Sequence, residues 1–275
     1  KGAPMVKDTD GDGDLEILMG TSNSLVNVDV KTSGTIDNHW YMHRGNLHRT
    51  GYYEFISSGG DMTVTVSNMS DWNLMGLPVT VGDNDQMSVY PSSIEGTLFS
   101  FEDSYVQESA LNPGTGYWLR FEETGETNIT GSPISRLTIP MQADWNLISG
   151  MSIPVQFTDI VDPEGIVIPG TLFGFGESYE QADGLEPGKG YWLRAYEAGV
   201  ITVTSGALSK TANQDFSFNG KANTFSINGS ELYFGVELSD RERLSYSLPP
   251  KPPAGAFDVR FKDGWKAVRD YGEVE

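Results

Sequence analysis

Carboxylates occur at every second position near the start of the chain, and residue types with this spacing can bind a metal ion. Residues 8–16 carry five of them: Asp8, Asp10, Asp12, Asp14 and Glu16. Gly11 and Gly13 allow this stretch to curl without a Cβ clash, so that alternate residues converge on one point. Calcium prefers about six to eight hard oxygen ligands, and the seventh loop position usually supplies a backbone carbonyl. The spacing therefore predicts a Ca²⁺ site, and a solvated acidic turn is the alternative.

A second candidate site combines an indole and a guanidinium, and it occurs twice. Trp118 and Arg120 share one face of a predicted strand, and Trp192 and Arg194 do the same further along. One interpretation is ligand recognition, in which Trp stacks on a sugar ring and Arg donates to hydroxyls or carboxylates. The other is packing, in which an Arg lies over an indole and covers a second layer. The sequence leaves both open.

Catalytic motifs are missing from the sequence. There is no phosphate loop, Gly-x-Ser-x-Gly elbow, zinc-type His/Glu motif or Cys. His39, His43 and His48 are the three histidines, and we expect polar contacts or packing from them rather than a transition-metal site. We predict a non-catalytic chain with no catalytic residues, and a hydrolase that uses a carboxylate pair is the remote alternative.

These candidate residues must be positioned by a tandem repeat in the middle of the chain. Asp-Trp-Asn-Leu occurs at residues 71–74 and 144–147. Gly-Thr-Leu-Phe occurs at residues 96–99 and 170–173, followed each time by Pro-Gly-x-Gly-Tyr-Trp-Leu-Arg. Pro-Gly predicts a type II turn before each Tyr-Trp strand.

Alternation with period two predicts strands throughout the repeat, and Tyr117, Leu119 and Phe121 should form one buried face. Further strands are expected at residues 62–66, 97–101, 126–129, 137–139, 165–168, 171–175 and 200–204. The fold class is therefore all-β, with tandem β-sandwich-like modules.

The amino-acid composition restricts the classes of partner that the chain can bind. With 18 Lys and Arg against 38 Asp and Glu, the net charge is −20, which disfavours nucleic acids and anionic membranes. No apolar run is long enough to span a membrane. Because the chain begins with Lys1, we expect it to be a piece of a longer protein whose targeting signals lie elsewhere.

Two segments resemble known families. Asp-x-Asp-Gly-Asp-Gly-Asp-Leu-Glu-Ile-Leu-x-Gly-Thr at residues 8–21, followed by Val26-Asn-Val-Asp-Val-Lys, resembles an FG-GAP/VCBS repeat of integrin-like β-propellers, which implies bound Ca²⁺. Residues 40–51, with Trp40, resemble the segment that closes such propellers in secreted bacterial proteins, although Tyr41 stands where Pro is usual.

The end of the chain supplies the second resemblance. Residues 232–238, 244–260 and Gly264-Trp265 resemble the β-sandwich region before the C-terminal sorting domain of bacterial proteins that use type IX secretion. Strands are expected at residues 216–218, 224–227, 232–236 and 257–261, with hairpin turns at Asn219-Gly220 and Asn228-Gly229. Residues 247–255 predict an extended, polyproline-like connector.

Together these features divide the chain into four parts: a propeller-end calcium repeat (1–53), two β modules (54–138 and 139–210) and a truncated third module (211–275). We expect a calcium-binding spacer or adhesion region of a secreted or cell-surface bacterial protein, with a polysaccharide or a cell-surface protein as partner. The alternative is a tandem carbohydrate-binding region that targets an attached enzyme.

Overall fold

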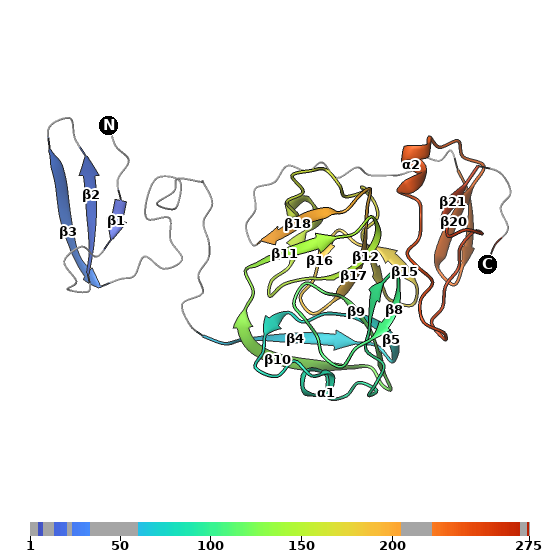
Figure 1. The fold of residues 1–275 in the computed structure, drawn as a ribbon, viewed down its shortest axis with the longest axis horizontal. Coiled ribbons are helices and arrows are strands. Elements are labelled where there is room, and N and C mark those ends of the chain that lie inside the picture. Colours follow the sequence, from blue (N-terminus) through green and yellow to red (C-terminus); the bar gives the residue numbers. More distant parts are fainter. Residues whose placement is uncertain are drawn as a thin grey trace. The chain divides into compact units, whose positions relative to one another are not determined.

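The computed structural model describes residues 5–7, 14–20, 24–33, 60–204, 222–269 and 274. Over these residues the protein is nearly all β, with many antiparallel sheets and two short α-helices, which confirms the predicted fold class (Figure 1). The chain forms two compact units, Lys1–Gly60 and Asp61–Glu275. None of the described helices has the length and apolar character needed to cross a membrane.

The first unit contains an antiparallel sheet of three strands: β1 (Met5–Lys7), β2 (Asp14–Gly20) and β3 (Leu25–Ser33). The register between β2 and β3 shifts between Asp14 and Glu16, which marks a bulge at the start of β2. Residues 17–19 lie within β2.

The second unit begins with two consecutive β modules. Strands of the first module are β4 (Met62–Asn68), β5 (Asp71–Met75), β6 (Val79–Thr80), β7 (Phe99–Glu102), β8 (Ser104–Gln107), β9 (Tyr117–Phe121) and β10 (Gly125–Pro133), with helix α1 (Gln86–Val89) after β6. Strands of the second are β11 (Arg136–Met141), β12 (Asp144–Ser149), β13 (Val155–Gln156), β14 (Phe173–Phe175), β15 (Tyr179–Gln181), β16 (Gly184–Leu185), β17 (Gly190–Ala195) and β18 (Gly199–Thr204), with 3-10 helix η1 (Phe157–Asp159) after β13.

Each module has the same principal sheet. Its strand order is β5-β9-β7-β8 in the first module and β12-β17-β14-β15 in the second. The remaining strands form the sheets β4-β10-β6, β11-β18 and β13-β16. Alternation along β9 and β17 sends one face into the core of its own module, which explains why Tyr117, Leu119 and Phe121 are all buried, as predicted.

The turns before β9 and β17 have the predicted geometry. Gly114 has φ 84° and Gly188 has φ 75°, which is the left-handed conformation that a type II turn requires at its third position. The amide of Thr115 donates to the carbonyl of Asn112 at 3.2 Å, and Lys189 repeats this bond in the second module. Pro-Gly therefore sets the entry to each Tyr-Trp strand.

Two predicted strands are wrong. Residues 165–168 form an isolated bridge between Val167 and Ala195 and no named strand, because the Asp162 carboxylate accepts the amide of Ile166, which is then lost to a longer ladder. Residues 257–261 also lie outside the named strands. The sequence alternates apolar and polar residues here, but burial does not follow that alternation: Arg260 is buried together with Val259 and Phe261. Its guanidinium binds Asp258 and the carbonyl of Pro249.

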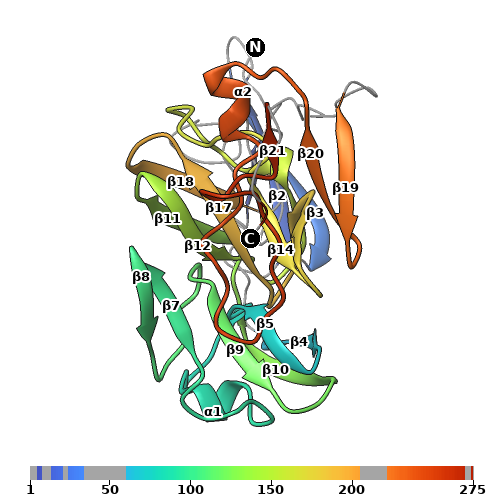
Figure 2. The ribbon, with the colours of Figure 1, turned by 90° about the vertical axis from the view of Figure 1, so that its right-hand side faces the viewer.

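The second unit ends with β19 (Asn223–Ile227), β20 (Ser230–Phe234), α2 (Asp240–Leu244) and β21 (Ala267–Val268). Asn228 and Gly229 both have positive φ, as the predicted hairpin turn between β19 and β20 requires. Between α2 and β21 the chain runs past β12 toward β5 and β9 and then returns (Figure 2). We call residues 248–256, which make this excursion, the strap.

Candidate functional site

Most of the predicted calcium ligands lie outside the described residues. Asp8, Asp10 and Asp12 belong to that part, as does the side chain of Asp14, although its backbone begins β2. Glu16 lies in β2 and is buried. Within the described residues, no group of three or more His, Cys, Asp and Glu side chains is arranged to hold a metal ion. The three histidines and residues 40–51 also fall outside the described part.

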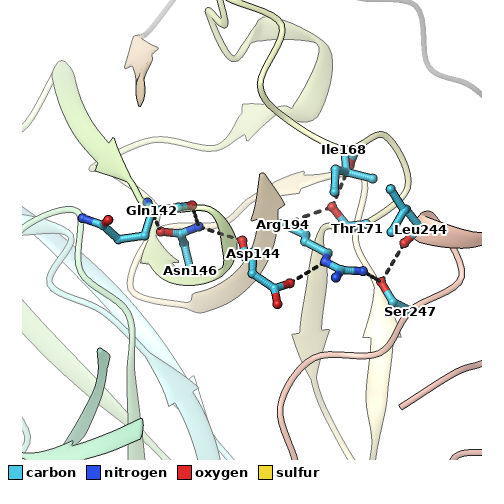
Figure 3. A network of polar contacts seen from close by, with 8 residues as sticks. All are labelled: Gln142, Asp144, Asn146, Ile168, Thr171, Arg194, Leu244 and Ser247. Atoms are coloured by element: carbon cyan, nitrogen blue, oxygen red, sulfur yellow. Dashed lines mark hydrogen bonds and ion pairs between the residues drawn. The ribbon is translucent and has the colours of Figure 1, made fainter. Parts of the chain in front are cut away.

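The repeated Asp-Trp-Asn residues fix the turn that leads into β5 and β12 of the principal sheets. Asn146 accepts the amide of Gln142 at 2.8 Å and donates to the carbonyls of Gln142 and Asp144 at 2.9 and 3.0 Å (Figure 3). These bonds hold Asp144 at φ 74°, a conformation that residues other than glycine seldom adopt. Asn73 makes the same three contacts in the first module. The repeated Asn is therefore a structural residue.

The repeated Arg completes this network. Arg194 Nε donates to the Asp144 carboxylate at 2.5 Å, and its Nη1 donates to the Ser247 hydroxyl at 2.8 Å (Figure 3). Its guanidinium carbon lies 5.6 Å from the ring centroid of Trp145. The amide of Arg194 donates to the Thr171 hydroxyl, so the Thr of Gly-Thr-Leu-Phe belongs to the same network.

The first module has the same arrangement in a more exposed setting. Arg120 Nε contacts the Asp71 carboxylate at 2.6 Å and lies over Trp72 with 5.9 Å to the ring centroid. The Arg120 side chain is 46% exposed, against 17% for Arg194. Both arginines therefore pair with an Asp and cover an indole, although this indole is Trp72 or Trp145 of the neighbouring strand and not the Trp118 or Trp192 with which the sequence groups them.

Trp118 and Trp192 are completely buried between the two modules. Each indole contacts a phenylalanine of the other module: Trp118 packs on Phe175 at 4.7 Å between centroids, and Trp192 packs on Phe101 at 4.8 Å. All four rings belong to one aromatic cluster. Neither indole is accessible to a ligand, so the repeated Trp joins the modules to each other.

The strap crosses this aromatic cluster. Proline has no amide donor, and within the strap the amide of Ala256 donates to the carbonyl of Pro253, which leaves the carbonyls of residues 250, 251 and 254 to accept from groups outside the strap. Three aromatic side chains of the repeats donate to strap carbonyls: Tyr179 to Pro250 at 2.7 Å, Tyr105 to Lys251 at 2.7 Å and Trp72 to Ala254 at 3.3 Å. Leu248 adds its side chain to the cluster. Burial raises the pKa of Tyr105 to about 12, so its phenol is protonated at neutral pH.

Two further contact regions between the modules are related by the repeat, and we call them seams. In one, the amide of Gly76 donates to the carbonyl of Gly188 at 3.0 Å. In the other, the amide of Ser149 donates to the carbonyl of Gly114, also at 3.0 Å. The two seams meet where Gly76 faces Ser149: a Cβ added to Gly76 would lie 2.2 Å from the Ser149 Cβ.

The first of these regions, the closed seam, is filled by side chains. A Cβ added to Gly188 would lie 2.3 Å from Val66 Cγ2, so the turn before β17 presses directly on β4. Lys189 donates its ammonium group to the carbonyl of Ser67. Burial lowers the pKa of Lys189 because desolvation disfavours its charged form.

The second region, the open seam, contains a cleft of about 870 Å³. Thr115 stands in the position of Lys189, and Ile139 stands in the position of Val66. A Cβ added to Gly114 would lie 3.5 Å from Ile139 Cγ1, which is an ordinary van der Waals distance. Both walls of this cleft come from the modules, and Pro250 of the strap lines it as well.

Compared with protein-family models, with curated proteins and with solved structures, the chain matches none of them. The roles of its residues therefore rest on the contacts described above.

Sequence reasoning missed Tyr105, Tyr179 and Lys189. The repeated Ser-Tyr after each Gly-Thr-Leu-Phe was a signal for the two tyrosines, because both copies keep it. Lys189 and Thr115 differ between the copies, so the repeat marks them only as a point where the modules diverge.

Proposed function

We propose that this chain is a non-catalytic, calcium-binding spacer and adhesion region of a secreted or cell-surface bacterial protein, in which the second unit acts as a rigid element. One observation carries the rigid-spacer part: the residues that the two modules share are used in contacts within and between them. Asp pairs with Arg, Asn fixes a turn, Trp fills the aromatic cluster, and Tyr holds the strap.

The buried aromatic cluster supports rigidity on physical grounds. Small units joined only by a linker move relative to each other unless their interface is large and apolar. Here the interface includes Trp118, Trp192, Phe173 and Leu248, all buried, and the strap ties both modules to the end of the unit. We therefore expect the two modules to keep a fixed orientation relative to each other.

A distance measurement between the modules tests this rigidity. The chain has no Cys, so spin labels on Glu126→Cys and Glu197→Cys, both exposed and one in each module, would be the only ones present. We expect a single narrow distance distribution, as narrow as that of a control pair within the first module, Ser109→Cys with Glu126→Cys. A broad distribution for the first pair alone would contradict a rigid spacer.

Calcium binding by residues 8–16 is the second part of the proposal. It is supported by the alternating carboxylates and by the resemblance to FG-GAP/VCBS repeats. Titration calorimetry should detect Ca²⁺ binding to the chain and its loss in the variant Asp10→Asn with Asp12→Asn, while Glu123→Gln in the second unit serves as a control. Because the two units are compact separately, we expect Ca²⁺ to raise the melting temperature of the first unit and leave the second unchanged.

The tandem carbohydrate-binding alternative changes in the light of this geometry. It relied on Trp118 and Trp192 as stacking platforms, and both indoles are buried. Their removal would destabilise the fold and would say nothing about a sugar. Any binding site on this unit must use other residues.

A further inference from the structure

The cleft of the open seam has the features of a binding site. It is enclosed by β7 and the turn before β9 on one side and by β11 and β12 on the other. At about 870 Å³ it lies within the range of small-ligand pockets, about 300–1,000 Å³. In the closed seam, which the same repeat builds, the turn before β17 presses on Val66 and Lys189 bridges the two modules, so the cleft is a departure from an otherwise shared arrangement.

The lining of the cleft is acidic and aromatic. Four carboxylates line it: Glu102, Asp103, Glu108 and Asp144. In the described part of the chain, no lysine or arginine belongs to this lining, although Asp144 pairs with Arg194 from behind. The ring of Trp145 and that of Phe101, both partly exposed, complete the walls.

Part of this polarity is specific to the open seam. Ser100 donates to the Glu108 carboxylate at 2.8 Å, and Ser100 is buried. In the second module the repeat places Gly174 and Ala182 at these two positions. A hydrogen-bonded pair of a buried serine and a partly exposed carboxylate is therefore present beside the cleft and missing beside the closed seam.

The closed seam shows what such a space accommodates. There the ammonium group of Lys189 enters between the modules and donates to the backbone of β4. At the same position the open seam has Thr115, which is too short to reach across and carries no charge. The open seam thus lacks an ammonium group where its counterpart supplies one, and it carries carboxylates instead.

We propose that the cleft of the open seam binds a primary ammonium group from another molecule, in the place that Lys189 fills in the closed seam. The carboxylates compensate the positive charge, and the partly exposed rings of Phe101 and Trp145, the latter already covered on one face by Arg194, are suited to the apolar stem of a lysine. A neutral saccharide would leave the carboxylates uncompensated, and an anion would be repelled. A lysine side chain of a partner polypeptide and a free polyamine share this chemistry.

A titration of the whole chain followed by NMR tests the proposal. The probes are pentalysine, pentalysine acetylated on every side chain, spermidine and a neutral oligosaccharide, cellopentaose. We expect pentalysine to bind, and we expect its acetylated form and the oligosaccharide to cause no chemical-shift changes. The affinity for pentalysine should fall as the NaCl concentration is raised, because the charges are partly exposed. Spermidine distinguishes the two sources: equal binding would indicate a general amine site, and weaker binding would indicate a polypeptide partner.

Two variants, each with a matched control, test whether pentalysine binds in the cleft. Glu108→Gln should weaken the binding of pentalysine about two- to fivefold, as expected for one partly exposed charge. Its control is Glu177→Gln, which removes an exposed carboxylate outside the cleft and should leave the affinity for pentalysine unchanged.

Thr115→Lys should weaken the binding of pentalysine about tenfold or more, because an ammonium group in the same chain competes at high effective concentration. Thr115→Met, similar in length and uncharged, should weaken it far less.

Several results would overturn the proposal. These are no binding of pentalysine, equal binding of its acetylated form, binding of the oligosaccharide alone, or equal loss in Thr115→Met and Thr115→Lys. If Thr115→Lys fails to fold, as judged by circular dichroism, Glu108→Gln and Glu177→Gln still decide the matter. None of these outcomes depends on the spin-label distances, so the proposal of a rigid spacer and the proposal of an ammonium site are tested independently.

Discussion

The closed and open seams keep the same backbone hydrogen bond and differ in the side chains around it. In both, the amide of the second residue after Asp-Trp-Asn-Leu donates at 3.0 Å to the glycine carbonyl of the opposite turn. Lys189 fills one seam, while Thr115 leaves a cleft in the other. The modules are therefore joined by backbone contacts and the shared aromatic cluster, and the side chains of each seam are free to differ.

The largest effect should come from breaking what both seams share. We expect Trp118→Ala and Trp192→Ala each to lower the free energy of unfolding by about 3–5 kcal/mol, because each leaves a cavity in a closed core. Urea unfolding followed by circular dichroism measures both. Tyr196→Ala, at an exposed position, is the control. If only one Trp variant were destabilised, the cluster would belong to a single module.

The two turn glycines should separate the seams. Gly188→Ala and Gly114→Ala both place a side chain at positive φ, which costs about 1–2 kcal/mol. Gly188→Ala also forces a Cβ against Val66, so we expect about 2–4 kcal/mol there in total. Comparison of the two urea midpoints gives the difference. Equal losses would mean that the closed seam is no tighter than the open one.

Alkaline pH should weaken the core that supports the closed seam. Burial raises the pKa of Tyr191 to about 12 in the folded protein, above the value near 10 of an unfolded tyrosine. Its stabilising contribution is thus complete below pH 10 and is lost as the pH rises from about 10 to 12, by about 2 kcal/mol. Melting temperatures across this range should fall less steeply in Tyr191→Phe than in the original chain. An unchanged slope would show that this phenol ionises freely.

The smallest effect concerns the ammonium group of the closed seam. Because burial lowers the pKa of Lys189 below 10.5, the unfolded chain holds more protons there between the two pKa values, and stability should rise with pH in that interval. Lys189→Met should lack this rise, a difference below about 1 kcal/mol. Urea midpoints of both proteins between pH 7 and 10 measure it, and Thr115→Val controls for a change in the other seam.

Local features of the fold could be predicted from the sequence. Pro-Gly identified the turns before β9 and β17, and period-two alternation correctly separated Tyr117, Leu119 and Phe121 from Trp118 and Arg120. These predictions succeeded because a turn and the pleat of a strand depend on neighbouring residues.

Features that depend on distant residues could not be predicted. Alternation shows that Trp118 faces away from its own core, yet it does not reveal that Phe175 of the other module covers it. The proline-rich segment was predicted as a connector, and its bond to Tyr105 joins residues 146 positions apart. For residues 8–13 the structure gives no test, so the calcium site remains a prediction.

The contact between Gly76 and Ser149 has a consequence for how the molecule can change. Reciprocal contacts of this kind are those of a symmetric dimer, in which every substitution occurs twice and the residue on the axis meets its own copy. Here both halves are encoded in one chain, so the axis holds a glycine on one side and a serine on the other. Covalent linkage frees each half to mutate alone. One seam can keep the halves together while the other acquires a chemistry of its own.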